Sequence, residues 1–302
     1  MNDNSTDLSA FGIGVDLRDG YAEVGDGVRL HYVEAGTGPL VVLLHGFPEF
    51  WYGWRRQIAP LVEAGYRVVA PDLRGYNLSS KPDDYTEYTA DKPAHDIQQL
   101  IRVLGAEKAP VVGHDWGGSI AWTLAMNHPE VVDRLVILNA AHPRKLNEGL
   151  KNPHQLERSW YFFYFQLKGT PEHHAERHNW EFFVHFLRDA QPPYTDDELD
   201  RYREAWSQPG AAKGMIDYYR AAVRLGSKQK VLTIATPTLV IWGQQDRFLG
   251  ADLAEPHAED VPNLVRVERI DGASHWVHHD EADRVNRLII EFLGADQPRA
   301  DA

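Results

Sequence analysis

Gly113-His114-Asp115-Trp116-Gly117 is the stretch that decides the fold of this 302-residue chain. Residues 109–112 before it (Ala-Pro-Val-Val) are strand-like, and residues 118–124 after it are helix-like. The residue at such a strand-to-helix turn takes a strained backbone conformation, and glycines beside it let neighbouring chain pass because they have no Cβ. The turn therefore predicts that Asp115 is thrust into a pocket as a nucleophile.

An aspartate at the centre of this turn restricts the chemistry that we expect there. A carboxylate that attacks an acyl carbon gives a reactive anhydride, whereas attack on a saturated, electrophilic carbon gives an ordinary ester. The expected target of Asp115 is therefore an alkylating carbon centre. The alternative at this point is a turn or helix N-cap aspartate, which is a common role for Asp.

Hydrolysis of such an ester needs a base that activates water and a group that orients the base. Asp246 follows the strand-like residues 237–242, and His275 follows the next strand-like run. Ligands bind at the carboxyl ends of strands in open α/β sheets, so these two residues are the candidates. The chain order of nucleophile, acid and histidine is the α/β-hydrolase order. Asp246 has a plain turn residue as its alternative, but the competing place after Leu138 holds Asn139 and no acid.

An oxyanion hole is expected directly after the apolar run Leu40–Leu44, in His45-Gly46-Phe47-Pro48. A turn there aims the backbone N–H of Phe47 at the same oxygen as the backbone N–H of Trp116. A plain strand-ending turn is the alternative. We expect His45 and His114 to be structural.

Strand-like and helix-like stretches alternate on both sides of the turn, which predicts an α/β fold, a mostly parallel sheet flanked by helices. After a loosely held lead-in over residues 1–20, the strand-like residues 28–35 and the turn at residues 36–39 are expected to start the sheet as a β-hairpin. Leu40–Leu44 fits a central strand buried on both faces. Further strands are expected over 67–70, 109–112, 134–138, 237–242 and 264–270, and helices near 51–64, 91–104, 117–127, 250–258 and 280–293.

The alternation stops at about residue 142 and resumes after residue 232. The sequence between is rich in aromatic residues, His and charge with helical spacing, as in residues 180–187. We therefore expect an inserted helical cap over residues 141–232 and a core domain made of residues 1–140 and 233–302.

Four segments together resemble the α/β-hydrolase-fold epoxide hydrolases of the soluble type. They are residues 45–49 (HGFPE), 66–76 (YRVVAPDLRGY), 113–118 (GHDWGG) and 272–276 (GASHW), and the similarity runs from about residue 20 to about residue 295. The resemblance implies that an epoxide and water are converted to a vicinal diol. It also implies two cap tyrosines that hydrogen-bond the epoxide oxygen.

Two cap segments resemble the tyrosine segments of that family. Matching residues 160–166 (WYFFYFQ) assigns the first role to Tyr161, and matching residues 216–220 (IDYYR) assigns the second to Tyr219. Tyr164 and Tyr218 are close rivals, and simple packing of the cap is the alternative for all four. A phenol suits the task because it donates a proton or hydrogen bond to a developing alkoxide while it stays neutral near pH 7.

Two other functions compete with this interpretation. Dehalogenases also use an aspartate nucleophile, but haloalkane dehalogenases often have Asn at the position of Phe47, and haloacetate dehalogenases typically have Arg at the position of Trp116. Neither rival explains the paired tyrosines. A non-catalytic ligand-binding relative has no need of Asp115, Asp246 and His275 together.

Composition excludes several other classes of protein. The net charge of −13 argues against nucleic acid or an anionic membrane as partner, and the absence of cysteine excludes disulfides and thiolate chemistry. The N-terminal residues are acidic and polar, unlike a secretory signal, and no stretch has the ~18 to 20 apolar residues that cross a bilayer. We expect a cytoplasmic monomer or homodimer without cofactor or metal.

Overall fold

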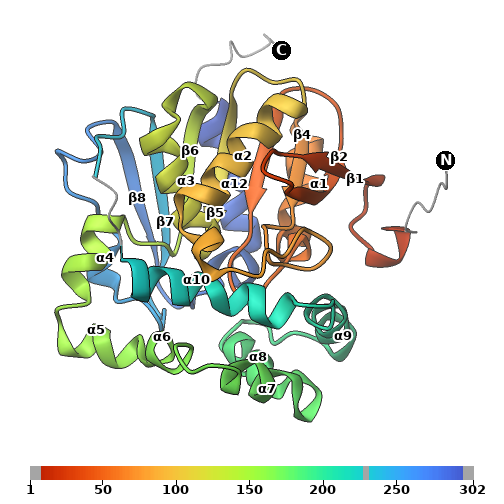
Figure 1. Ribbon diagram of the computed structural model, residues 1–302. Coiled ribbons are helices and arrows are strands. Elements are labelled where there is room, and N and C mark those ends of the chain that lie inside the picture. The colour runs from red at the N-terminus through yellow and green to blue at the C-terminus, as the bar shows by residue number, and fades with distance from the viewer. Residues whose placement is uncertain (1–7, 227–230, 295–302) are drawn as a thin grey trace, which may run out of the picture.

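The computed structural model describes residues 8–226 and 231–294, and it contains an eight-stranded sheet in the order β1-β2-β4-β3-β5-β6-β7-β8 (Figure 1). β2 pairs antiparallel with both of its neighbours, and the strands from β4 to β8 pair in parallel. The strands are β1 (Leu17–Glu23), β2 (Arg29–Ala35), β3 (Leu40–Leu44), β4 (Arg67–Pro71), β5 (Ala109–His114), β6 (Val132–Leu138), β7 (Thr238–Gly243) and β8 (Leu264–Ile270).

Helices cover both faces of this sheet. α2 (Asp91–Val103) packs on α3 (Trp116–Asn127), and α1 (Arg55–Glu63) packs on α12 (Ala282–Gly294) with α11 (Val277–Asp280) beside it. Every residue of β3 is buried, because helices shield a parallel sheet on both sides. The predicted α/β-hydrolase architecture is confirmed.

Helices and turns fill the stretch between β6 and β7, and Figure 1 shows them below the carboxyl end of the sheet. We keep the name cap for residues 141–232, of which 227–230 lie outside the described residues; the division into two domains stays a prediction. The cap helices are α4 (Pro143–Gly149), α5 (Pro153–Arg158), α6 (Trp160–Tyr164), α7 (Thr170–Glu176), α8 (Glu181–Leu187), α9 (Asp196–Trp206) and α10 (Ala211–Leu225).

Short 3-10 helices link these elements. They are η1 (Leu8–Phe11), η2 (Trp51–Trp54), η3 (Tyr85–Tyr88), η4 (Pro129–Val131), η5 (His178–Trp180) and η6 (Ala251–Leu253).

Three local expectations were wrong. The lead-in is not loose throughout, because Leu17–Glu23 forms β1 and makes the first hairpin with β2 (residues 1–7 lie outside the described residues). The strand after the turn at residues 36–39 does not pair with β2; β3 pairs with β4 and β5. The helix expected near 250–258 is only the short turn η6, and Pro256 interrupts the stretch that follows it.

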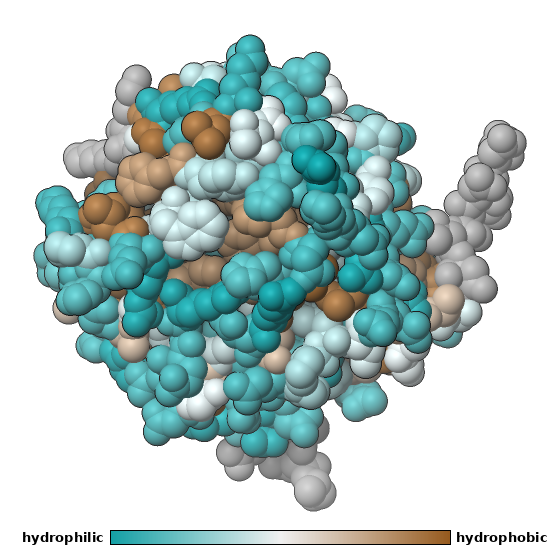
Figure 2. Space-filling view, turned by 90° about the horizontal axis from the view of Figure 1, so that it is seen from below, coloured by the Kyte–Doolittle hydropathy of each residue, from teal (hydrophilic) through white to brown (hydrophobic). Residues whose placement is uncertain are grey.

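The outer face of the cap carries apolar surface. Figure 2, seen from the side on which the cap lies, shows brown apolar atoms gathered among hydrophilic ones. Large apolar side chains on and after α5 and α6 are exposed, namely Leu156, Trp160, Phe163 and Leu167. None of the helices in the described part of the chain has the length and apolar character needed to span a bilayer.

Candidate active site

Asp115 sits at a strained turn between β5 and α3. Its φ of 50° and ψ of −119° lie in a region of backbone conformation that residues other than glycine rarely adopt. The turn is tight enough that a Cβ on Gly113 would collide with the carbonyl of Gly117, and a Cβ on Gly117 would collide with the carbonyl of Leu44. The strained turn predicted from the sequence is therefore present, and it leaves the Asp115 carboxylate partly exposed.

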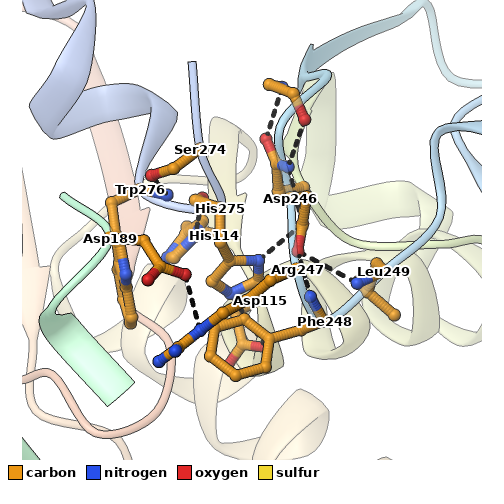
Figure 3. Close-up of polar contacts among 12 residues, drawn as sticks. His114, Asp115, Asp189, Asp246, Arg247, Phe248, Leu249, Ser274, His275 and Trp276 are labelled. Atoms are coloured by element: carbon orange, nitrogen blue, oxygen red, sulfur yellow. Dashed lines mark hydrogen bonds and ion pairs between the residues drawn. The ribbon is translucent and has the colours of Figure 1, made fainter. Parts of the chain in front are cut away.

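Asp246 and His275 come from the loops after β7 and β8, and they meet Asp115 at the carboxyl end of the sheet. His275 Nδ1 lies 2.7 Å from Asp246 Oδ2, and His275 Nε2 lies 3.6 Å from Asp115 Oδ2. Figure 3 shows the imidazole between the two carboxylates. The structure thus brings together all three residues of the predicted set.

Asp246 is held as a buried carboxylate by several donors. Its Oδ1 accepts hydrogen bonds from the backbone N–H groups of Phe248 (2.7 Å) and Leu249 (2.9 Å). Its Oδ2 accepts one from the Asn139 side chain at 2.7 Å. Burial alone would raise the pKa of Asp246, but its contacts with His275 and these donors lower it. Asp246 is therefore ionised and fixed in place.

The sequence did not reveal this role of Asn139. In the sequence, Asn139 only showed that no acid follows β6. In the structure, its amide donates to Asp246 and accepts a hydrogen bond from the Gly243 N–H at 2.9 Å, so it links the end of β6 to the loop after β7. Its φ is 41°, a left-handed conformation that Asn tolerates better than most residues. The only signal for this role in the sequence was an Asn placed directly after a predicted strand.

His275 carries an unusual charge state. Burial favours the neutral ring, but the carboxylates of Asp246 and Asp115 outweigh it and raise the pKa of His275 to about 10. In the resting site the imidazole is therefore protonated at neutral pH. This charge depends in part on Asp115 remaining a carboxylate.

The predicted oxyanion hole is partly visible in the hydrogen bonds. The backbone N–H of Phe47, in the loop after β3, donates to Asp115 Oδ1 at 2.8 Å. Trp116 is the first residue of α3, and the N–H groups of a first helical turn have no partner within the helix. The Phe47 N–H thus contacts the carboxylate, and the part assigned to the Trp116 N–H stays a prediction.

Both assigned tyrosines lie at the cavity that contains Asp115, in the cap opposite the carboxylate. Tyr161 on α6 and Tyr219 on α10 are buried, and their rings are 5.5 Å apart. Burial, and then the nearby Asp115 charge, raises the pKa of each hydroxyl well above its usual value. Both phenols are therefore neutral and able to donate.

The rival tyrosines are engaged elsewhere. The Tyr164 hydroxyl lies 2.8 Å from His174 Nδ1, and Tyr164 does not line the cavity. Tyr218 lines the cavity, but its hydroxyl donates to the carbonyl of Arg74 at 2.9 Å. The geometry thus favours Tyr161 and Tyr219.

The cavity has a volume of about 670 Å³, within the usual range for small-molecule sites. Its walls come from the core and from the cap. The lining residues are Tyr88, Thr89, Ala90, Asp91, Asp115, Trp116, Ser119, Thr123, Asn127, Ala140, Ala141, Pro143, Leu146, Asn147, Leu150, Tyr161, Phe162, Tyr218, Tyr219, Ala221, Ala222, Val223, Leu225, Gly226 and Leu249.

A buried cluster of polar side chains lies next to His275. Glu49, His114 and His278 each bring one ligand atom within 4.8 Å of the others, the described set best suited to a metal ion. Glu49 and His114 also have partners within the protein: Glu49 Oε2 lies 3.2 Å from His114 Nδ1, and Glu49 Oε1 accepts from the Tyr202 hydroxyl at 3.1 Å. The ring nitrogens of His278 have no hydrogen-bond partner among the described residues, and its Nε2 lies 3.4 Å from Glu49 Oε2. His114 Nε2 donates to the carbonyl of His275 at 2.9 Å. His114 is thus structural, as expected.

Known proteins share this architecture. The family model described as alpha/beta hydrolase fold matches residues 39–282. The Bacillus subtilis AB hydrolase superfamily protein YfhM is 44% identical over 89% of this chain and 95% of its own length. Human epoxide hydrolase 4 is 38% identical over 93% of this chain and 80% of its own length.

Solved structures of epoxide hydrolases have a similar fold. A Bacillus megaterium epoxide hydrolase in complex with an inhibitor superposes with a TM-score of 0.83 at 33% identity, covering 91% of this chain and all of that one. Epoxide hydrolase A from Mycobacterium thermoresistibile gives a TM-score of 0.79 at 31% identity, over 92% and 98% of the two chains. Fold, site geometry and relatives coincide, and the chain belongs to the α/β-hydrolase-fold epoxide hydrolases, which are hydrolases acting on ether bonds.

Proposed function

We propose that this protein hydrolyses an epoxide to a vicinal diol through an ester on Asp115. The observation that carries the proposal is the placement of Tyr161 and Tyr219 on the cap side of the same cavity that holds Asp115. A nucleophile on one side and neutral proton donors on the other suit a three-membered ether ring. No cofactor is required.

In the first step, Asp115 Oδ2 attacks a ring carbon and the C–O bond to that carbon breaks. The electron pair goes to the ring oxygen, which takes a proton from Tyr161 or Tyr219. Asp115 Oδ1 keeps its hydrogen bond to the Phe47 N–H, so it becomes the carbonyl oxygen of the ester. The donor tyrosine is then reprotonated from the imidazolium of His275 through solvent, which leaves His275 neutral.

The loss of the Asp115 charge makes the proton transfer from His275 favourable. Its carboxylate is one of the groups that raise the pKa of His275, and ester formation removes that charge. The pKa of His275 therefore falls once the ester forms. Asp115 thus converts its own partner from an imidazolium into a base.

In the second step, neutral His275 takes a proton from water, and the hydroxide adds to the ester carbon. The oxyanion on Oδ1 is held by the N–H groups of Phe47 and Trp116. Collapse breaks the bond between the ester carbon and Oδ2, and the leaving alkoxide takes the proton of the added hydroxyl. The products are the diol, the Asp115 carboxylate and protonated His275, which is the resting state.

A screen of several epoxides and haloalkanes, scored for diol and halide together, tests the function. We expect diol from a simple aryl epoxide and no halide release from the haloalkanes, because the paired tyrosines serve an oxygen leaving group. Halide release without diol would instead identify a dehalogenase, and neither product would point to a ligand-binding relative.

The tyrosines can be tested by single hydroxyl deletions. Tyr161→Phe and Tyr219→Phe are each expected to slow ester formation by about 10- to 100-fold, because each removes one donor to the developing alkoxide. Tyr164→Phe is the matched control, since its hydroxyl bonds His174 outside the cavity. Single-turnover kinetics separate ester formation from hydrolysis, and an equal loss in all three variants would refute the assignment.

A further inference from the structure

The long wall of the active-site cavity is one face of α3. Ser119, Thr123 and Asn127 follow Asp115 at intervals of four residues, and all line the cavity. Residues four apart lie on the same helix face, and each residue advances the helix by about 1.5 Å, so Asn127 lies about 18 Å beyond Asp115. The remaining residues from 120 to 126 are apolar and buried. The cavity is therefore elongated and has hydrogen-bonding groups along one side.

These polar groups differ in how they are used. The Thr123 hydroxyl donates to the carbonyl of Ser119 at 3.0 Å and is thereby satisfied within the helix. Among the described residues, the side-chain amide of Asn127 has no hydrogen-bond partner, although Asn127 is only half-exposed. An amide in such a place is available to a polar group of a bound molecule.

The walls opposite α3 are aliphatic in their middle part. α4 and the residue after it contribute Leu146 and Leu150, together with the exposed Asn147, and α10 contributes Leu225. Between the nucleophile and Asn127, a ligand thus meets mostly apolar side chains on these sides, which favours an apolar chain there.

The far end opens to solvent beside an acidic group. Asp91, at the start of α2, lines the cavity and is exposed. One turn later His95 contacts His128, whose neighbour is Asn127, with ring centroids 6.1 Å apart, so this end of α2 meets the far end of α3. Asp91 therefore lies near Asn127 at the mouth.

Charge at the cavity is of one sign. Its described lining residues include two carboxylates, Asp91 and Asp115, and no Lys, Arg or His. Neither His95 nor His128 is among them, and burial lowers the pKa of His128, so that ring stays neutral at pH 7. Among the described lining residues a carboxylate on a ligand tail finds no cationic partner, and Asp91 repels it.

We propose that this cavity selects elongated epoxides with an apolar chain next to the ring and an uncharged hydrogen-bonding group at the far end, received by Asn127. Tails that end in a carboxylate are rejected. The inference rests on the proposed epoxide hydrolysis at Asp115 and names the substrate class of that site.

The test uses terminal epoxides that share one long alkyl chain and end in a methyl, a primary amide or a carboxylate. The wild-type protein is expected to show a kcat/KM for the amide at least about tenfold above that for the carboxylate. Asn127→Leu, of similar volume, is expected to lower the amide-to-methyl ratio about fivefold, and Asn127→Gln to retain part of it. Asn127→Lys is expected to raise the carboxylate-to-amide ratio by about tenfold or more, because it supplies the missing cation.

Gln208→Leu, a polar-to-apolar change at a residue outside the cavity lining, is the control and should leave these ratios unchanged. Equal kcat/KM for the amide and carboxylate tails, or equal losses on all three substrates in Asn127→Leu, would overturn the inference. A short aryl epoxide distinguishes a failure of the proposed substrate class from a failure of the proposed epoxide hydrolysis. If it gives diol while the tails are not discriminated, only the substrate class is wrong; if no epoxide gives diol, both proposals fail.

Discussion

Replacing Asp115 by alanine is expected to lower the rate of diol formation by about 10⁴-fold or more. The variant has no atom that can form the ester, and the imidazolium of His275 loses one of the carboxylates that stabilise it. The measurement is steady-state formation of diol from an aryl epoxide, with circular dichroism to show that the fold is kept. We expect it to be kept, because alanine removes no buried hydrogen bond except the one to the Phe47 N–H.

Asp16→Ala is a suitable control for this experiment, since Asp16 is an exposed residue outside the helices and strands. It should retain the wild-type rate. Diol formation at an undiminished rate in Asp115→Ala would mean that water attacks the epoxide directly, and the ester mechanism would be wrong.

Replacing His275 by glutamine is expected to separate the two steps of the reaction. Attack by Asp115 does not need a base, so the ester still forms, whereas its hydrolysis needs the proton acceptor that the variant lacks. We expect a burst of at most one epoxide consumed per protein, followed by a rate about 10³-fold or more below that of the wild type. Mass spectrometry of a digest should show the mass of the epoxide added to the peptide that contains Asp115.

The double variant Asp115→Ala, His275→Gln should show no added mass on this peptide, and His95→Gln should turn over without accumulating it. Adduct on a different peptide, or continuous turnover by His275→Gln at the wild-type rate, would assign the nucleophile or the base to another residue.

Local patterns predicted the parts of the molecule whose structure is set locally. The apolar run Leu40–Leu44 predicts a buried central strand on its own, and the glycines around Asp115 predict the tight turn because few other residues fit there. The positions of Asp246 and His275 followed from a topological rule, since carboxyl ends of parallel strands meet at one edge. The register of the tyrosine segments came from family resemblance, and the hydroxyl contacts of Tyr164 and Tyr218 now favour the same choice.

Features set by distant partners could not be predicted in this way. β1 contains polar residues and Gly20, and it becomes a strand because β2 pairs along its whole length. Asn139 gains its role only when β6 and β7 lie side by side, which brings its amide to Asp246. The polar face of α3 is visible as a spacing in the sequence, but only the cavity shows that it faces a ligand space.

The position of the cap between β6 and β7 has a consequence for synthesis of the chain (Figure 1). A ribosome completes the nucleophile turn and the whole cap before it makes β7 and β8, which carry the acid and the base. Until those strands arrive, the backbone N–H and C=O groups along one edge of β6 have no strand to pair with, and such an edge invites association with other chains. The growing polypeptide is therefore most prone to aggregate shortly before β7 and β8 emerge, and it gains its chemical activity only with the loops that follow them.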